Sequence, residues 1–213
     1  MLERFTWFRQ AAFRYDGDGF TIYIDPWGVT DPRPADAIFI THAHSDHLST
    51  DDIEKVRKDG TKIFAPHDVA EELTGDVVPV QPGDTVNVGS ISGQAVPAYN
   101  TAEERLDYHP KSNKWVGYVL SLDGRDHYHA GDTDHVPELD GVKAAVAFVP
   151  IGGTYTMEAD EAAGLVKSIG PDLAVPMHFG FVVGSPSDTE QFVKECDPVR
   201  VEIMTPTNPF ERS

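Results

Sequence analysis

The stretch THAHSDHLS, residues 41–49, places three histidines and an aspartate within six consecutive positions, 42 to 47. No helix or strand requires so many imidazole groups together. Imidazole and carboxylate groups are typical ligands of zinc, iron or manganese. On a loop that leaves a strand, His42 and His44 can point toward one ion, while Asp46 and His47, after the turn, can face a second. One loop cannot complete such a site, so further ligands must come from elsewhere in the chain.

Candidate partners follow three predicted strands. Asp132, in HAGDTD, has a short carboxylate after Gly131 that can reach between two ions about 3.5–4 Å apart. His178, in VPMHFG, ends another strand. Asp25, in YIDPW, ends a third, and we expect it to hold the histidine loop by accepting backbone N–H bonds rather than to bind metal. Strand ends and one loop that converge predict a catalytic metal site at the edge of a sheet.

The secondary-structure pattern is that of a sheet-rich chain. Strands are predicted at 20–27, 36–41 and 199–206, a hairpin at 114–132 around an Asp-Gly turn, and helices at 49–60 and 158–171. Meandering strands come first, and helix–strand alternation follows. The pattern predicts a single α/β domain over residues 1–213, with helices outside the sheets.

Composition excludes several functional classes. The net charge of −18, from 17 basic and 35 acidic residues, disfavours a nucleic-acid partner, whose binding surface would be basic. No apolar run approaches the roughly 18–20 residues of a membrane span. A single cysteine, Cys196, excludes an intramolecular disulfide framework, and Glu3 and Arg4 stand where a signal peptide would be apolar. We therefore expect a cytoplasmic protein.

The motifs resemble a known family. HAHSDH matches the HxHxDH signature of the metallo-β-lactamase superfamily, and Asp25, Asp132 and His178 fall in the order of its other motifs. More narrowly, IYIDPW, YHAGDTD, VPIGGTYTM and VPMHFG resemble a branch of small metal-dependent hydrolases related to ascorbate-6-phosphate lactonase and N-acyl-phosphatidylethanolamine phospholipase D. The resemblance covers nearly the whole chain. It implies a four-layer αββα sandwich, two divalent ions at one edge, and hydrolysis by a metal-bound hydroxide. Zinc is the expected metal, with manganese, nickel and iron as alternatives.

One ligand position departs from this pattern. Where the branch has a histidine after a short strand, this chain reads VPAYN and has Asn100, and the nearest histidine, His109, follows nine residues later. Either His109 loops back to complete the first metal site, or water or the Asn100 amide oxygen completes a weaker one. We favour His109. Tyr155, in GGTYTM, is expected either to donate to a developing oxyanion or to pack, and Trp27 is expected in the core.

The sequence thus predicts a dinuclear hydrolase that acts on an ester, phosphoester, lactone or amide of a small molecule. Asp46 is assigned a catalytic role beyond metal binding, because it can orient the attacking hydroxide and shuttle its proton. Two alternatives stay open. Asn100 at a ligand position suggests a metal-binding module without turnover, and His/Asp ligands also suit an iron redox enzyme on the same scaffold.

Overall fold

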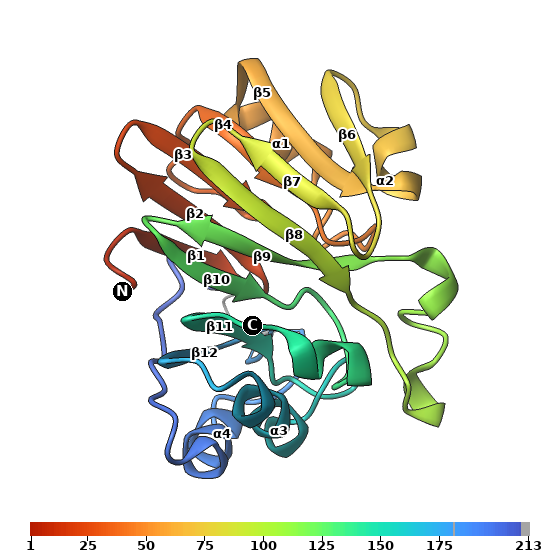
Figure 1. Ribbon diagram of the computed structural model, residues 1–213, viewed down its shortest axis with the longest axis vertical. Coiled ribbons are helices and arrows are strands. Elements are labelled where there is room, and N and C mark those ends of the chain that lie inside the picture. Colours follow the sequence, from red (N-terminus) through yellow and green to blue (C-terminus); the bar gives the residue numbers. More distant parts are fainter. Residues whose placement is uncertain (181, 210–213) are drawn as a thin grey trace.

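Two mixed six-stranded sheets form the centre of the molecule (Figure 1). The structure, a computed structural model, describes residues 1–180 and 182–209. The first sheet has the order β1 (Phe5–Arg9), β2 (Ala12–Gly17), β3 (Phe20–Ile24), β4 (Ala35–Phe39), β5 (Arg57–Pro66), β6 (Asp76–Val80). The second has the order β12 (Leu173–Met177), β11 (Val146–Pro150), β10 (Arg125–His129), β9 (Val116–Leu122), β8 (Ile91–Pro97), β7 (Thr85–Val88).

Each sheet is antiparallel on one side and parallel on the other. In the first, β1–β2 and β2–β3 pair antiparallel, whereas β3–β4, β4–β5 and β5–β6 pair parallel. In the second, the meander from β7 to β10 is antiparallel, and β10–β11 and β11–β12 are parallel. Parallel strands bring their carboxyl ends to one edge. The segments that follow β3, β4, β10 and β12 carry most of the predicted metal-site residues, and the segment after β8 carries Asn100 and His109.

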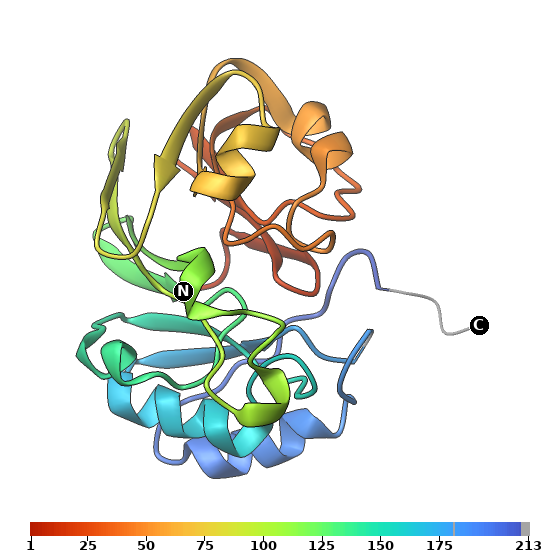
Figure 2. The same cartoon turned by 90° about the vertical axis from the view of Figure 1, so that its right-hand side faces the viewer.

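Helices cover the outer faces of both sheets. The α-helices are α1 (Thr50–Val56), α2 (His67–Glu72), α3 (Ala159–Ile169) and α4 (Asp188–Cys196), and the 3₁₀ turns are η1 (Glu103–Arg105), η2 (Lys111–Asn113) and η3 (Pro137–Gly141). Figure 2 shows α1 and α2, in orange and gold, at the opposite end of the molecule from α3 and α4, in blue. The expected four-layer αββα arrangement is confirmed.

The hydrophobic core is divided between the layers of the sandwich. Between the sheets, Phe39 of β4 lies 5.1 Å from Phe64 of β5 and 5.2 Å from Tyr118 of β9, measured between ring centroids. A second cluster joins the first sheet to its helices, where Ile53 and Val56 of α1 pack with Ile38 and Ile63. Each large apolar side chain buried in this way contributes about 1.5–3 kcal/mol relative to exposure. In the part of the chain that the structure describes, none of the helices has the length and hydropathy that a membrane span requires.

Two predicted elements differ from the structure. Helix α1 ends at Val56 rather than at residue 60, because Arg57 is already extended and pairs with Ala35 of β4. The predicted strand at 199–206 is reduced to one bridge between Val201 and Ala174. The chain then crosses to the N-terminal strand, where residues 207 and 208 donate backbone hydrogen bonds to the carbonyls of residues 7 and 8.

Candidate metal centre

The histidine loop is a tight connection between β4 and α1. The backbone N–H groups of His47 and Leu48 both donate to the carbonyl of His44, at 2.9 and 2.8 Å. Ser49 then caps α1 by accepting a hydrogen bond from the N–H of Asp52. Because backbone hydrogen bonds close the turn, the candidate ligands on it are free to project toward one space. These are His42, His44, Asp46 and His47.

Asp25 orients this loop from the end of β3. It is fully buried, at φ 46°, and its Oδ1 accepts the Thr41 N–H at 2.7 Å. Its Oδ2 accepts the Thr41 hydroxyl at 2.6 Å and the His47 Nδ1–H at 2.8 Å. Since the Thr41 hydroxyl proton is committed to Asp25, its oxygen accepts the His42 Nδ1–H at 2.9 Å. Both histidines therefore direct Nε2, the atom that can bind a metal, into the shared space.

His109 joins the loop from a distant part of the chain. Its Nδ1 lies 2.6 Å from the Asn100 Oδ1, and the Asn100 N–H donates to the His109 carbonyl at 2.8 Å. The Asn100 amide nitrogen donates in turn to Asp134 at 2.7 Å. With its Nδ1–H bound to Asn100, His109 presents Nε2 to Asp132, 3.4 Å from Oδ2. The structure thus brings His109 to the centre and places Asn100 behind it.

Asp132 and His178 approach from the ends of β10 and β12. His178 Nε2 lies 3.2 Å from Asp132 Oδ2 and 3.3 Å from Asp46 Oδ2. Asp132 Oδ1 lies 3.4 Å from His47 Nε2. The preceding Gly131 adopts φ 63°, and a Cβ there would press on Thr41 and on the backbone of β9. A glycine at 131 therefore lets the Asp132 carboxylate enter the centre.

The seven predicted ligands form overlapping groups whose donor atoms lie within 4.8 Å of one another. These groups are His42, His44 and His109; His42, His47 and Asp132; and Asp46, His47 and His178. Three of the buried atoms that face the shared space form no hydrogen bond: His47 Nε2, His109 Nε2 and Asp132 Oδ1. Buried polar atoms without partners are costly. A cation supplies the missing partner, so the residues fit divalent metal ions.

The electrostatics also favour a cation. Burial, with the charge of His47 second, holds the pKa of His42 well below its ordinary value, so this imidazole stays neutral. Burial opposes the charged form of His47, but Asp132, Asp46 and Asp25 outweigh it and raise the pKa of His47 well above its ordinary value. Although burial favours the protonated acid, His178 and His47 hold the pKa of Asp132 well below its usual range. The excess carboxylate charge attracts positive charge, which divalent ions can supply in place of protons.

A cavity of about 490 Å³ opens onto these residues. It is lined by Trp27, His44, Ser45, Asp46, Tyr108, Asp132, Tyr155, His178 and Val182. Tyr155 therefore lies at the cavity, and Trp27, expected in the core, is half-buried and lines it as well. Trp27 lies shortly after the end of β3, so the loop that positions Asp25 also carries this ring to the site.

Sequence reasoning missed three neighbours of the centre. The Trp115 ring lies 5.0 Å from the His42 ring, between centroids, and its Nε1–H donates to Asp68 at 2.7 Å. The Gln10 amide Nε2 lies 3.4 Å from His178 Nε2. Tyr108 lines the cavity one residue before His109. Only the position of Tyr108 beside a candidate ligand offered a signal; Trp115 and Gln10 are brought in by the tertiary fold.

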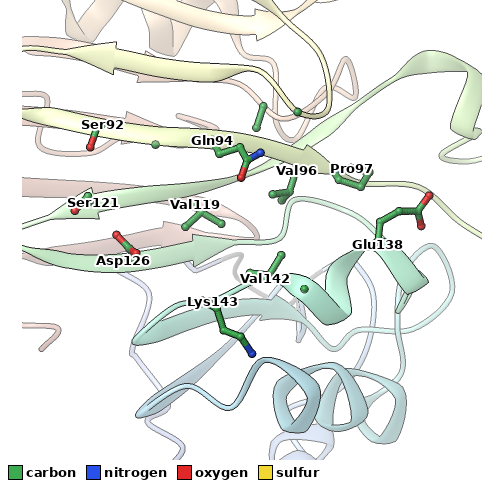
Figure 3. A pocket seen from close by; sticks show the side chains of 14 residues that line it. Ser92, Gln94, Val96, Pro97, Val119, Ser121, Asp126, Glu138, Val142 and Lys143 are labelled. Atoms are coloured by element: carbon green, nitrogen blue, oxygen red, sulfur yellow. The ribbon is translucent and has the colours of Figure 1, made fainter.

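A second, larger hollow lies elsewhere. Figure 3 shows this space of about 630 Å³ between β8, β9 and η3, with Gln94, Val119 and Lys143 among its lining side chains. None of the described residues that line it is a histidine or cysteine. Size alone therefore does not identify the reactive site, and the donor set selects the smaller cavity.

Comparison with known proteins shows which families the chain is similar to. A family model for the β-lactamase superfamily domain matches residues 4–178, a range that contains the whole histidine cluster and ends at His178. The chain is similar to UPF0173 metal-dependent hydrolases of Methanopyrus kandleri, 32% identical over 98% of this chain and 100% of that protein, and of Thermococcus kodakarensis, 35% identical over 94% and 96%. A crystal structure of a protein from Parabacteroides distasonis, described as a metal-dependent hydrolase, is 31% identical with a TM-score of 0.86, covering 93% of this chain and 91% of that chain.

Proposed function

Because this chain belongs to the UPF0173 metal-dependent hydrolases of the β-lactamase superfamily, we propose that it hydrolyses a small molecule at a centre of two divalent ions. The candidate bonds are those of an ester, phosphoester, lactone or amide. The motifs that resemble ascorbate-6-phosphate lactonase and N-acyl-phosphatidylethanolamine phospholipase D support a lactone or phosphodiester among them.

The division of the donor atoms around Asp132 carries this proposal. His42, His44 and His109 would hold the first ion. Asp46, His47 and His178 would hold the second. Asp132 stands between the two sets, 3.4 Å from His109 Nε2 on one side and 3.2 Å from His178 Nε2 on the other. A short carboxylate in this position suits a bridging ligand of a two-metal hydrolase.

Held by these donors, two divalent ions would lower the pKa of a bound water toward ~7 and would act as Lewis acids on the scissile oxygen. Imidazole and carboxylate donors suit zinc, iron, manganese and nickel, and the lack of cysteine among them argues against a structural zinc site. Zinc is the proposed metal. The protein contributes the fixed positions of these donors. Asp25 and Asn100 contribute further by setting which nitrogen of His47 and of His109 carries the proton.

Asp46 is the proposed catalytic carboxylate. It is half-buried and lines the cavity, so it is accessible to a substrate. Although burial raises its pKa, His47 and the hydrogen bond to His178 outweigh that effect and keep the pKa of Asp46 below its ordinary value. An ionised carboxylate at this place can accept a proton from the attacking water and return it to the leaving group.

The contact between Asn100 and His109 supports turnover over the metal-binding module. That alternative arose because Asn100 stands where a ligand histidine is expected. With His109 beside His42 and His44, the first set has three imidazoles, and Asn100 needs no bond to the metal. We therefore retain hydrolysis as the proposed activity.

Metal-loaded protein should be assayed against four chromogenic substrates: a neutral aryl ester, a lactone, a phosphodiester and a β-lactam. We expect turnover of at least one substrate that chelation abolishes and added metal restores. His178→Ala should remove it, whereas His135→Ala should not, because His135 pairs with Asp140 outside the cavity. Equal activity in the His178→Ala and wild-type proteins would overturn the assigned centre.

A further inference from the structure

Building on the proposed hydrolase function, we propose that the cavity selects an uncharged substrate, an ester, lactone or amide that carries an aromatic group. The metal centre would take the scissile bond. The aromatic group would lie against Trp27, Tyr108 and Tyr155.

Four loops, at the edge where the parallel strands of the two sheets end, supply the apolar wall of the cavity. Trp27 follows β3, Tyr108 lies between η1 and η2, Tyr155 follows β11, and Val182 follows β12. The Tyr108 and Tyr155 rings meet edge to face, with centroids 4.6 Å apart. Aromatic side chains prefer this geometry with one another and with aromatic ligands. The cavity volume of about 490 Å³ is in the range of small-molecule sites.

Two of these side chains are exposed to solvent. Tyr108 is 41% exposed and Val182 is 58% exposed. A single exposed apolar residue needs no explanation. Two such residues that line one cavity beside the candidate catalytic carboxylate Asp46 are suited to binding an apolar group of a ligand. An apolar group of the substrate would remove both from water when it binds.

The buried Arg105 side chain holds together the two segments that carry Tyr108 and Tyr155. Arg105 donates to the Thr156 carbonyl, pairs with Glu161 at 2.8 Å and lies 3.2 Å from Asp134. It thereby ties the segment that carries Tyr108 to the segment that carries Tyr155. Binding costs less when the wall is already in place, so this arrangement is suited to recognition.

Trp27 is similarly fixed. The Arg9 guanidinium carbon lies 5.0 Å from the centroid of the Trp27 ring, a cation–π contact. The indole therefore has a defined orientation at the cavity, although it stands on a loop. A rigid aromatic surface favours a flat ligand group over a flexible one, because less conformational freedom is lost on binding.

Charge argues against an anionic substrate. None of the described residues that line the cavity is lysine or arginine, while Asp46 and Asp132 both line it. The chain carries a net charge of −18, which lowers the local concentration of anions. Beyond the reacting group, a phosphate or carboxylate on the substrate would meet no lysine or arginine among the described residues that line the cavity.

The test uses probes that are not turned over. Acetohydroxamic acid and 2-naphthohydroxamic acid carry the same metal-chelating group and differ in the aromatic part. Their dissociation constants for the zinc-loaded protein are measured by calorimetry. We expect the naphthyl probe to bind at least about tenfold more tightly, as burial of its apolar surface implies. A naphthyl probe with a carboxylate at position 6 should lose most of this advantage.

A matched pair of variants locates the effect. Tyr108→Ala should reduce the naphthyl advantage at least about fivefold. Leu106→Ala should leave it unchanged, because Leu106 is 46% exposed on the same segment but does not line the cavity. Equal affinity of the two uncharged probes for the wild-type protein overturns the aromatic subsite and leaves the metal centre standing. Failure of both probes to bind the zinc-loaded protein overturns the proposed function itself.

Discussion

The Asn100 side-chain oxygen lies 2.6 Å from His109 Nδ1, and both residues are buried, at 2% and 1% exposure. This contact leaves His109 Nε2 directed at Asp132. Behind it, Asp134 accepts the Asn100 amide and the backbone N–H groups of residues 101 and 102. Asn100 thus connects the candidate ligand His109 to the buried carboxylate of Asp134.

Asn100→Ala should therefore weaken metal binding at the first site. We expect a loss of about 10- to 100-fold in affinity, as is typical when a partner that orients a ligand histidine is removed. His109→Ala should lose more, because it removes the donor itself. Metal titration monitored by calorimetry measures both changes.

The matched control is Asn87→Ala, at an exposed asparagine of β7 remote from the histidines. Its metal affinity should equal that of the wild type. If Asn100→Ala also binds metal like the wild type, the contact with His109 has no role in metal binding.

Removal of Arg105 should destabilise the fold. Asp134 is fully buried, and Arg105 is the cation beside it, at 3.2 Å. Arg105→Ala would leave that carboxylate buried without its charge partner, at a cost of about 3–5 kcal/mol in the free energy of unfolding. Urea denaturation measures the loss. Arg200→Ala, at an exposed arginine paired with Glu202, should cost less than about 1 kcal/mol, and an equally small loss for Arg105→Ala would refute the structural role.

Cys196 should be unreactive in the native state. Burial between α4 and the core raises the pKa of its thiol to about 12. The raised pKa means that the folded protein retains the proton where the unfolded chain, near 9, releases it. This contribution to stability is complete below pH 9 and is lost as the pH rises toward 12. At pH 8 an aromatic disulfide reagent should modify the unfolded chain in seconds and the native protein at the rate of unfolding; rapid labelling of native protein would contradict this.

Much of the site could be predicted because its residue types are rare in ordinary loops. The spacing from His42 to His47 indicated a metal loop directly, and Asp132 and His178 each followed a recognisable strand. The structure brings all of them together, and His109 with them. His109 was harder to assign, since nothing in the local sequence shows that the segment after Asn100 returns to the histidine loop.

The remaining parts depend on contacts between distant segments. Gln10 reaches His178 only because the N-terminal hairpin β1–β2 forms the edge of the first sheet, and that hairpin was not predicted. Trp27 was assigned to the core on its residue type, whereas the turn after Asp25 carries it to the cavity. The predicted strand at 199–206 failed because only Val201 pairs with β12 before the chain crosses to β1.

The number of metal ions that each variant binds tests the central claim most directly. Elemental analysis of zinc-saturated protein, after removal of free metal, should give two ions per chain in the wild type. It should give one in His109→Ala and one in His178→Ala, because each variant removes a donor from only one of the two sets around Asp132. A wild-type protein that holds at most one ion, or variants that both retain two, would contradict the dinuclear centre.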